Sequence, residues 1–298
     1  MCRLLGYVSE TRRPVDDILG RAEFASYREL SHLHRDGWGM AWLADPDAAD
    51  GDGLSAGEDR TLGEGRLRAR HSVLPAHEDP AFDALAERSL GRAGFVHLRW
   101  ATSGLAVAES NTHPFLASGW AFAHQGSIPS PERLDALLAP GWLCRRQGTT
   151  DSERYFLYLL QCVEREGDLV GGIRQAVNDI VALCGVASLN AVLLSSSSLV
   201  VVHGRAGLES PRDDLLAAVA RPEDVPADHL DAYFRLQYRR RDGDIVITSS
   251  GVAGQGWEEF PQDSILHVDL ETRSMSFHGF DGSVTPAGAF ADLATHDR

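Results

Sequence analysis

The chain has 298 residues, 43% hydrophobic and 24% charged, which is typical of a globular protein whose core needs no disulfide or metal to fold. Its formal net charge is −15 at pH 7 and no dense block of Lys or Arg is present, which argues against nucleic acid and anionic membranes as partners. Four scattered cysteines without a CxxC pair, no secretory signal and no apolar run of membrane-spanning length predict a cytoplasmic protein with reduced thiols.

The first half of the chain predicts strands separated by polar loops. A cysteine, Cys2, directly follows the initiator methionine in MCRLLGY. Residues 45–60 are acidic, small and Gly-rich, and we expect a mobile surface insertion there. GFVHLRWATSG, from Gly94, and SGWAFAHQGSI, from Ser118, each predict a buried strand that ends in a turn.

Two helices and then further strands are predicted in the second half. TTDSERYFLYLLQCVERE predicts a helix in which Thr150 and Glu153 form a capping box, and DLVGGIRQAVNDIVALCG has apolar residues at helical spacing. Short apolar or β-branched runs predict strands beginning at Ser188, Ser198, Asp244 and Ser264. Strands on both sides of a helical pair predict an α+β protein with helices layered on sheet faces.

Cys2 has two chemical interpretations. If Met1 is removed, the residue carries both a thiol and a free α-amine, with ordinary pKa values of about 8.5 and about 8. The amine could then activate the sulfur directly or through one water, which makes Cys2 a candidate nucleophile. Alternatively, Cys2 packs in an edge strand with Leu4 and Gly6, as an inert cysteine.

Several polar motifs lie where loops leave the predicted strands. In chain order they are HRDGWGM (34–40), HLRWATSG (97–104), NTHPF (111–115), FAHQGSI (122–128) and GTTDSE (148–153). With MCRLLGY before them, this ordered set resembles the class II glutamine amidotransferase domain of the N-terminal-nucleophile hydrolase superfamily, in its stand-alone, single-domain form.

The resemblance covers roughly residues 2 to 260 and implies both a fold and a reaction. The fold is a four-layer αββα sandwich of two mainly antiparallel sheets, with the nucleophile at the start of a central strand. The reaction is hydrolysis of a γ-glutamyl amide, usually glutamine, through a thioester on the first residue. We expect one domain over 2–298, in which 261–298 finish a sheet edge and form a tail.

The resemblance also implies substrate-binding residues. Arg99 matches the arginine that grips the substrate α-carboxylate, for which a planar guanidinium is suited, and Thr102 adds a hydroxyl donor. Trp100 lies in the same motif. Asp151 matches the acid that receives the substrate ammonium, although an Asp in the first turn of a helix is also favoured by the helix dipole. His113 either contacts substrate or is a structural histidine satisfied by the backbone.

FAHQGSI departs from the family motif His-Asn-Gly, in which the asparagine amide and the glycine N–H stabilise the oxyanion. Gln125 has the same amide head on a stem that is one methylene longer, and Gly126 retains the backbone donor. We expect a working hydrolase whose rate or selectivity is altered. Ser103 stands where the family often has a histidine, a loss that we expect to be tolerated.

No cofactor or metal is predicted, because the histidines at 97, 113 and 124 lack metal-ligand spacing and no phosphate-binding loop is present. Three functions stay open. The first is a glutaminase that supplies ammonia to a separate synthase. The second is a γ-glutamyl hydrolase acting on a biosynthetic intermediate or peptide, and the third is a non-catalytic binding homologue, suggested by Gln125.

Overall fold

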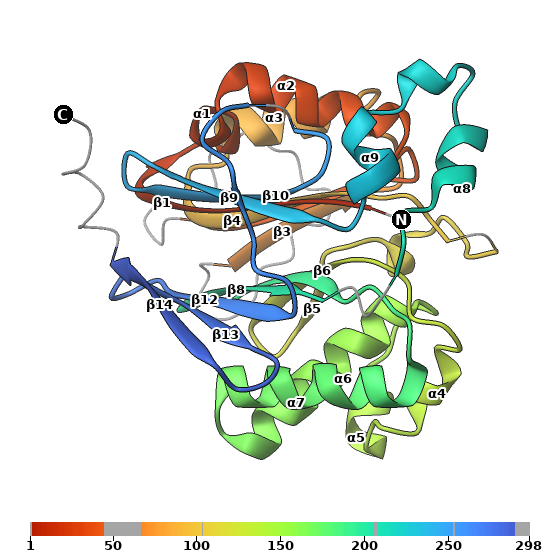
Figure 1. Cartoon of the computed structure of the whole chain (residues 1–298), viewed down its shortest axis with the longest axis vertical. Coiled ribbons are helices and arrows are strands. Elements are labelled where there is room, and N and C mark those ends of the chain that lie inside the picture. The colour runs from red at the N-terminus through yellow and green to blue at the C-terminus, as the bar shows by residue number, and fades with distance from the viewer. Residues whose placement is uncertain (1, 45–66, 103, 205–207, 253, 290–298) are drawn as a thin grey trace.

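The computed structural model describes residues 2–44, 67–102, 104–204, 208–252 and 254–289. The insertion predicted at 45–60, Ser103 and the end of the predicted tail lie outside these ranges. Within the described residues the chain forms two seven-stranded antiparallel sheets that pack face to face, with helices on both outer faces (Figure 1). The predicted α+β class and four-layer αββα sandwich are therefore confirmed.

The first sheet has the strand order β11-β9-β10-β1-β4-β2-β3, which places β1 at its centre. Its strands, in chain order, are β1 (Arg3–Arg13), β2 (Trp38–Leu43), β3 (Leu67–Ser72), β4 (Gly91–Leu98), β9 (Leu236–Arg241), β10 (Asp244–Ser249) and β11 (Glu258–Glu259). Strand β1 is hydrogen-bonded to β4 on one side and to β10 on the other. Cys2, one residue before β1, is thus held at a central position and not at a sheet edge.

The second sheet has the order β14-β13-β12-β8-β7-β6-β5. Its strands are β5 (Phe115–Ala117), β6 (Trp120–Gln125), β7 (Asn190–Leu194), β8 (Ser198–His203), β12 (Ser264–Asp269), β13 (Ser274–Gly279) and β14 (Val284–Ala289). The three last strands form one edge of this sheet, so the segment that follows residue 260 completes a sheet edge.

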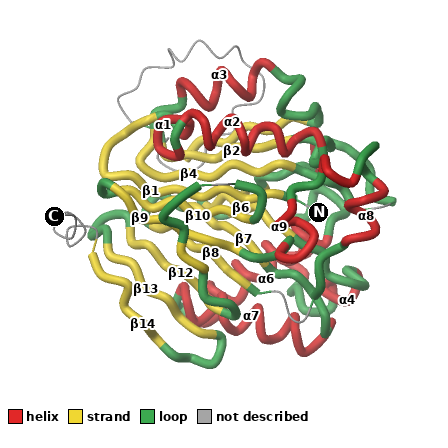
Figure 2. The backbone as a smooth tube through the Cα atoms, turned by 45° about the horizontal axis from the view of Figure 1, so that its top comes forward, coloured by secondary structure: helices red, strands yellow, loops and turns green. Residues whose placement is uncertain are grey.

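Helices cover the two outer faces, as Figure 2 shows. The first sheet is covered by α1 (Val15–Leu19), α2 (Arg21–Glu29) and α3 (Pro80–Arg88), and the second by α4 (Glu132–Asp135), α5 (Pro140–Leu143), α6 (Asp151–Glu166) and α7 (Leu169–Cys184). Two short helices, α8 (Arg212–Ala217) and α9 (Ala227–Ala232), lie near the amino terminus at one end of the sandwich.

The two long helices form as predicted, because each has a capped start and a continuous apolar face. The Thr150 hydroxyl accepts from the backbone N–H of Glu153 at 3.1 Å. The Glu153 carboxylate departs from the predicted capping box and accepts from Gln147 N and Gly148 N, each at 2.7 Å. The carboxylate thus fixes the preceding loop, whose tight approach to Ser110 leaves no room for a side chain at Gly148.

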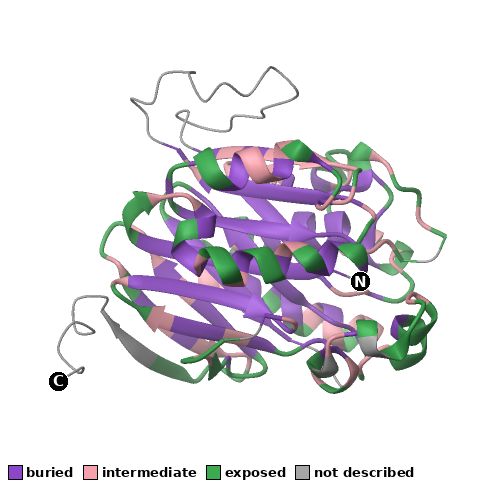
Figure 3. Cartoon of the chain, turned by 90° about the horizontal axis from the view of Figure 1, so that it is seen from above, coloured by how far each residue is buried: buried purple, intermediate pink, exposed green. Residues whose placement is uncertain are grey.

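Buried apolar layers between the sheets and beneath the helices hold the sandwich together, and the central strands of both sheets are mostly buried (Figure 3). The inter-sheet layer is built from alternate residues of each strand, including Leu4, Phe95, Ala123 and Val192. The intervening residues of the strands pack against the helices, as Leu5 and Val96 do on the first sheet. This alternation decides which side chains at the strand ends face the space between the sheets.

Candidate functional site

The ends of four strands bring polar side chains together in the inter-sheet layer. Cys2 has the same parity as Leu4, and His97 is the direct cross-strand partner of Leu4 and has the parity of Phe95. On the second sheet, Gln125 follows Ala121 and Ala123 in alternation, and its cross-strand partner is Asn190. Because β1 begins where β4 ends, and β7 begins where β6 ends, each pair of polar residues lies at one end of its sheet.

The Cys2 thiol is shielded and readily ionised. The residue is 6% exposed, and its Sγ lies 3.8 Å from the carbonyl oxygen of Trp100. Burial raises the pKa of the thiol, but the neighbouring His97 and the amino-terminal charge outweigh it and lower the pKa to about 6. A cysteine with this pKa is largely thiolate at neutral pH.

His97 is a site residue to which the motif analysis gave no role. Its Nε2 lies 3.2 Å from the carbonyl oxygen of His124, and a carbonyl can only accept, so Nε2 carries the hydrogen. The other ring nitrogen, Nδ1, is buried and has no hydrogen-bond partner among the described residues. The signal that could have identified His97 is its strand parity, which places it on the same sheet face as Cys2.

The Gln125 amide is fixed by backbone and side-chain contacts. The side chain is completely buried, and its Nε2 donates to the carbonyl oxygen of Tyr233 at 2.9 Å. Its Oε1 accepts from Asn190 Nδ2 at 3.4 Å, while the Gln125 backbone carbonyl accepts from Ser188 Oγ at 2.8 Å. An amide nitrogen has two hydrogens, so one donor remains beyond the Tyr233 bond.

Gly126, directly after β6, packs closely against the backbone at Ser188. A Cβ at this position would lie 2.2 Å from the carbonyl oxygen of Ser188 and 2.6 Å from His124 Nε2. Only glycine fits here without displacing the backbone.

A buried arginine links the Tyr233 carbonyl to Cys2. Arg3 is completely buried, and its Nε donates to the Cys2 carbonyl oxygen at 2.6 Å, while both terminal nitrogens lie 3.3 Å from the Tyr233 carbonyl oxygen. The guanidinium also stacks on the Tyr233 ring, 3.8 Å from the ring centroid, and donates to Ser250 Oγ at 2.6 Å. Nothing in the sequence motifs indicated this network.

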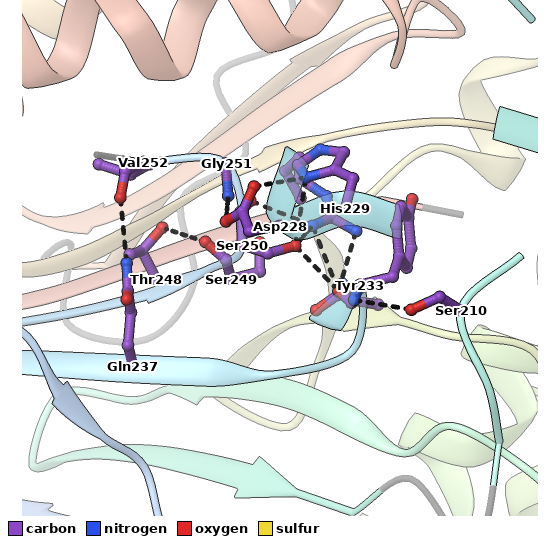
Figure 4. Close-up of polar contacts among 12 residues, drawn as sticks. Ser210, Asp228, His229, Tyr233, Gln237, Thr248, Ser249, Ser250, Gly251 and Val252 are labelled. Atoms are coloured by element: carbon purple, nitrogen blue, oxygen red, sulfur yellow. Dashed lines mark hydrogen bonds and ion pairs between the residues drawn. The ribbon is translucent and has the colours of Figure 1, made fainter. Parts of the chain in front are cut away.

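Figure 4 shows the groups that enclose this arginine network. Ser250 Oγ lies 3.2 Å from the Tyr233 carbonyl oxygen and 3.3 Å from His229 Nδ1, and Asp228 approaches the same nitrogen at 3.5 Å. Burial, reinforced by the charge of Arg3, lowers the pKa of His229 to about 4. His229 is therefore neutral at physiological pH, and the positive charge of Arg3 dominates this cluster.

Arg99, predicted to grip a carboxylate, is buried and held by neutral partners. Its terminal nitrogens donate to the carbonyl oxygens of Asp36 at 3.2 Å and Ala106 at 3.3 Å. In the described ranges it forms no ion pair with a carboxylate. The Asp36 carboxylate instead accepts from the Ala101 N–H at 2.7 Å, which fixes the loop that follows Arg99.

A cleft of about 530 Å³ opens beside this loop. It is lined by Trp100, Thr102, Ser127, Leu208, Glu209, Asp214 and Phe234, among others. Trp100 therefore borders both the Cys2 thiol and the cleft, and Ser127 directly follows Gly126. The cleft thus brings the predicted residues Trp100 and Thr102 together, and Trp100 also contacts Cys2.

Asp151 and His113 occupy different surroundings from those of Arg99. The Asp151 carboxylate accepts from Ile128 N at 2.7 Å, at the start of α6 and two residues beyond Gly126. His113 is buried with its ring centroid 4.2 Å from that of His97, and neither of its ring nitrogens has a hydrogen-bond partner in the described part of the chain. The structure thus provides no backbone partner for its ring. Burial lowers the pKa of His113 well below its usual range.

Neither a metal cluster nor a membrane helix is found in the part of the chain that the structure describes. No three His, Cys, Asp or Glu side chains there are grouped so as to hold a metal ion, and no helix there is long and apolar enough to cross a bilayer.

Comparisons with known proteins agree with the motifs. A family model described as glutamine amidotransferases class-II matches residues 1–223. The chain is 36% identical over 104 residues to the glutamine–fructose-6-phosphate aminotransferase of Pseudomonas aeruginosa, and 30% identical over 100 residues to the probable glutamine amidotransferase DUG3 of Saccharomyces cerevisiae. These matches span 34% and 32% of this chain but only 16% and 28% of the two relatives.

Two solved structures share the fold at low sequence identity. A glutamine aminotransferase class-II domain protein from Silicibacter pomeroyi aligns with a TM-score of 0.57 at 19% identity, over 94% of this chain and 99% of that one. Glutamine phosphoribosylpyrophosphate amidotransferase from B. subtilis aligns with a TM-score of 0.59 at 15% identity, over 94% of this chain and 49% of that one. The sandwich is therefore the fold of the N-terminal-nucleophile hydrolases.

Proposed function

The chain belongs to the class-II glutamine amidotransferases, and from this premise we propose that it is a cysteine-dependent γ-glutamyl amide hydrolase. In its simplest form it releases glutamate and ammonia from glutamine, and a separate synthase accepts the ammonia. The observation that carries the proposal is the Cys2 thiol, shielded at the start of a central strand with a pKa lowered to about 6, beside the loop that contains Arg99.

The proposed chemistry begins when Met1 is removed. The Cys2 thiolate attacks the γ-carbonyl of the substrate. The exposed α-amine accepts the thiol proton and passes it to the departing nitrogen. Gln125 and Gly126 stabilise the negative oxygen of the tetrahedral intermediate by N–H donation. The nitrogen product leaves with a proton, a thioester forms on Cys2, and water hydrolyses it to glutamate.

Substrate is oriented by groups of opposite charge. The Arg99 guanidinium, which is neutralised by no described carboxylate, receives the α-carboxylate of the substrate, with Thr102 as a second donor and Trp100 beside them. We assign the α-ammonium to Asp151. His113 lines the interior beside His97, and we assign it to the same substrate-binding shell.

A second candidate function is favoured by the cleft beside Trp100. Its volume of about 530 Å³ exceeds what the amide nitrogen of glutamine needs, and Leu208 and Phe234 give it apolar surface. This space supports a γ-glutamyl hydrolase whose leaving group is a larger amine from a biosynthetic intermediate or peptide. The two candidate functions differ in the group attached to the scissile nitrogen, which is only hydrogen in glutamine and a larger substituent in the alternative substrates.

One experiment tests the shared mechanism. Intact mass shows whether Met1 is removed, and glutamate release is measured for the parent, for Cys2→Ala and for a Cys144→Ala control at an exposed, unpaired cysteine. We expect turnover to be lost only in Cys2→Ala, with its fold retained. Substantial activity in Cys2→Ala would remove the mechanism.

A panel of γ-glutamyl amides separates the alternatives. Efficient cleavage of glutamine supports the ammonia-supplying role, whereas poor cleavage of glutamine and efficient cleavage of a bulkier amide supports the second function. No glutamate release from any donor would favour a binding homologue. We also propose a cytoplasmic location, which the four unpaired cysteines support.

A further inference from the structure

A buried histidine beside the candidate nucleophile is not used by the proposed mechanism. His97 is fully buried in the inter-sheet layer, and it is diagonal to Cys2 across the β1–β4 pair, since its direct partner is Leu4. Diagonal neighbours on one face of an antiparallel pair are about 7–8 Å apart at the backbone, within reach of an imidazole and a thiol. The charge of His97 lowers the pKa of the Cys2 thiol, which shows that the two side chains are electrostatically coupled.

The hydrogen-bond partners of His97 determine which nitrogen faces a proton donor. Nε2 donates to the His124 carbonyl, so in the neutral ring Nδ1 holds a lone pair. Among the described residues, this Nδ1 has no hydrogen-bond partner. A proton received from the adjacent thiol would give this buried nitrogen a hydrogen to donate to the thiolate.

We propose that His97 is the base that ionises the Cys2 thiol in the resting enzyme. The proton moves from Sγ to Nδ1, so that a neutral thiol and a neutral imidazole become a thiolate and an imidazolium with no change in net charge. The inference rests on the proposed function for the role of Cys2 as nucleophile. It goes beyond that function because the thiol no longer depends on the α-amine for its ionisation.

This assignment frees the α-amine for a different step. An α-amine has an ordinary pKa of about 8, so at neutral pH most of it is an ammonium group and cannot accept the thiol proton. With the thiol proton on His97, the ammonium can instead donate its proton to the departing nitrogen. The resulting neutral amine then accepts a proton from the water that hydrolyses the thioester.

The groups around His97 do not compete for the proton. The His113 ring packs 4.2 Å away, and burial, together with the charge of His97, keeps its pKa well below the usual range. His124 supplies a carbonyl to His97, while its own ring donates from Nε2 to the Ser188 carbonyl at 2.7 Å. Three further positive charges lie nearby. The amino terminus lowers the pKa of the Cys2 thiol, Arg99 lowers the pKa of His113, and the Arg3 guanidinium donates to the Cys2 carbonyl oxygen.

The test measures ionisation of Cys2 without any substrate. Carbamidomethylation of the Cys2 peptide by iodoacetamide is followed by mass spectrometry from about pH 5 to about pH 9.5, in the parent, in His97→Gln and in the matched control His267→Gln. His267 lies on β12 of the second sheet and contacts Ser198 at the start of β8, whereas the candidate site lies at the opposite end of that sheet, where β7 begins at Asn190. Circular dichroism establishes that each variant is folded.

We expect a midpoint near pH 6 in the parent and in His267→Gln. In His97→Gln the midpoint should rise by at least about 1.5 units toward the ordinary thiol value, and the alkylation rate at pH 6 should fall at least about tenfold. An unchanged midpoint in a folded His97→Gln would overturn the inference.

A second measurement keeps the inference testable if His97→Gln does not fold. In the ¹⁵N-labelled parent at pH 7, both ring nitrogens of His97 should be protonated, and alkylation of Cys2 should return the ring to the neutral Nε2–H form. A His97 ring that is neutral before alkylation would refute the proposed thiolate–imidazolium pair. If the titration behaves as expected but no γ-glutamyl donor is cleaved, the proposed function fails while the ionisation of Cys2 by His97 stands.

Discussion

Replacing Gln125 with methionine tests whether this glutamine acts as an oxyanion donor. Methionine has a similar length and an unbranched stem, so the change removes the amide head and keeps most of the buried volume. The groups left behind keep other partners. The Tyr233 carbonyl still accepts from Arg3 and Ser250, and Asn190 Nδ2 still donates to the Phe234 carbonyl at 2.7 Å.

These contacts separate the expected effect on catalysis from that on stability. Loss of one oxyanion donor raises the barrier by about 2.7–4 kcal/mol, so kcat should fall about 10²–10³-fold. Loss of one neutral hydrogen bond, without leaving an orphaned partner, should cost only about 0.5–1.5 kcal/mol of unfolding free energy. Tm should therefore fall by only a few degrees.

A matched control is available on α6. Gln161 also donates to a backbone carbonyl, that of Leu137 at 2.8 Å, and accepts from Ala139 N at 2.7 Å. Gln161→Met should lose similar stability and keep its kcat. The assay is glutamate release at saturating donor, with thermal unfolding followed in parallel. A kcat for Gln125→Met within about threefold of the parent would refute the oxyanion role.

Three further outcomes are expected. Arg99→Lys replaces a two-pronged donor by a point charge, so KM for the donor should rise by about tenfold or more with a smaller change in kcat, and an unchanged KM would exclude the carboxylate contact. His229 has a pKa of about 4 in the folded protein and about 6.5 when unfolded, so the unfolded chain binds more protons between these pH values. Acidification from pH 6.5 to pH 4 should therefore lower the free energy of unfolding by about 3 kcal/mol. Denaturant titrations should find a smaller decrease over this pH range in His229→Asn. Gly39→Ala places a Cβ 2.0 Å from the His113 carbonyl oxygen and should cost about 3 kcal/mol in denaturant titrations, whereas Gly141→Ala, with open space around it, should cost little.

The elements that the sequence predicted well have a long or uniform pattern of apolar residues. The helix that begins at Asp151 has an N-terminal cap and sixteen residues with one apolar face, and strands such as the one from Ser198 are continuous apolar runs. Helices α1 and α2 were not predicted, because Gly20 divides this stretch into pieces of 5 and 9 residues. Short helices give too few turns for a period to be recognised.

The sequence could nominate candidate site residues where residue type carries the signal, but it could not predict their backbone contacts. The motifs pointed to Cys2 and Arg99 because a thiol and a guanidinium have distinctive chemistry. The contact of Gln125 is to the main-chain carbonyl of Tyr233, and every residue has such a carbonyl, so no sequence pattern marks it. Arg3 was hidden for the same reason, since its partners come from segments more than 200 residues away and are mostly carbonyl oxygens.

The central position of β1 has a consequence for how the protein is made. Leu5 pairs with Val96 on one side and with Thr248 on the other, so β1 is synthesised long before its neighbour β10. At about 5–20 residues per second, the first strand waits tens of seconds or less for β10. Until then the residues before β1 stay outside a closed sheet, and once the sheet closes, Cys2 is buried in place. The removal of Met1 that the proposed mechanism requires is therefore expected during biogenesis and not in a later maturation step.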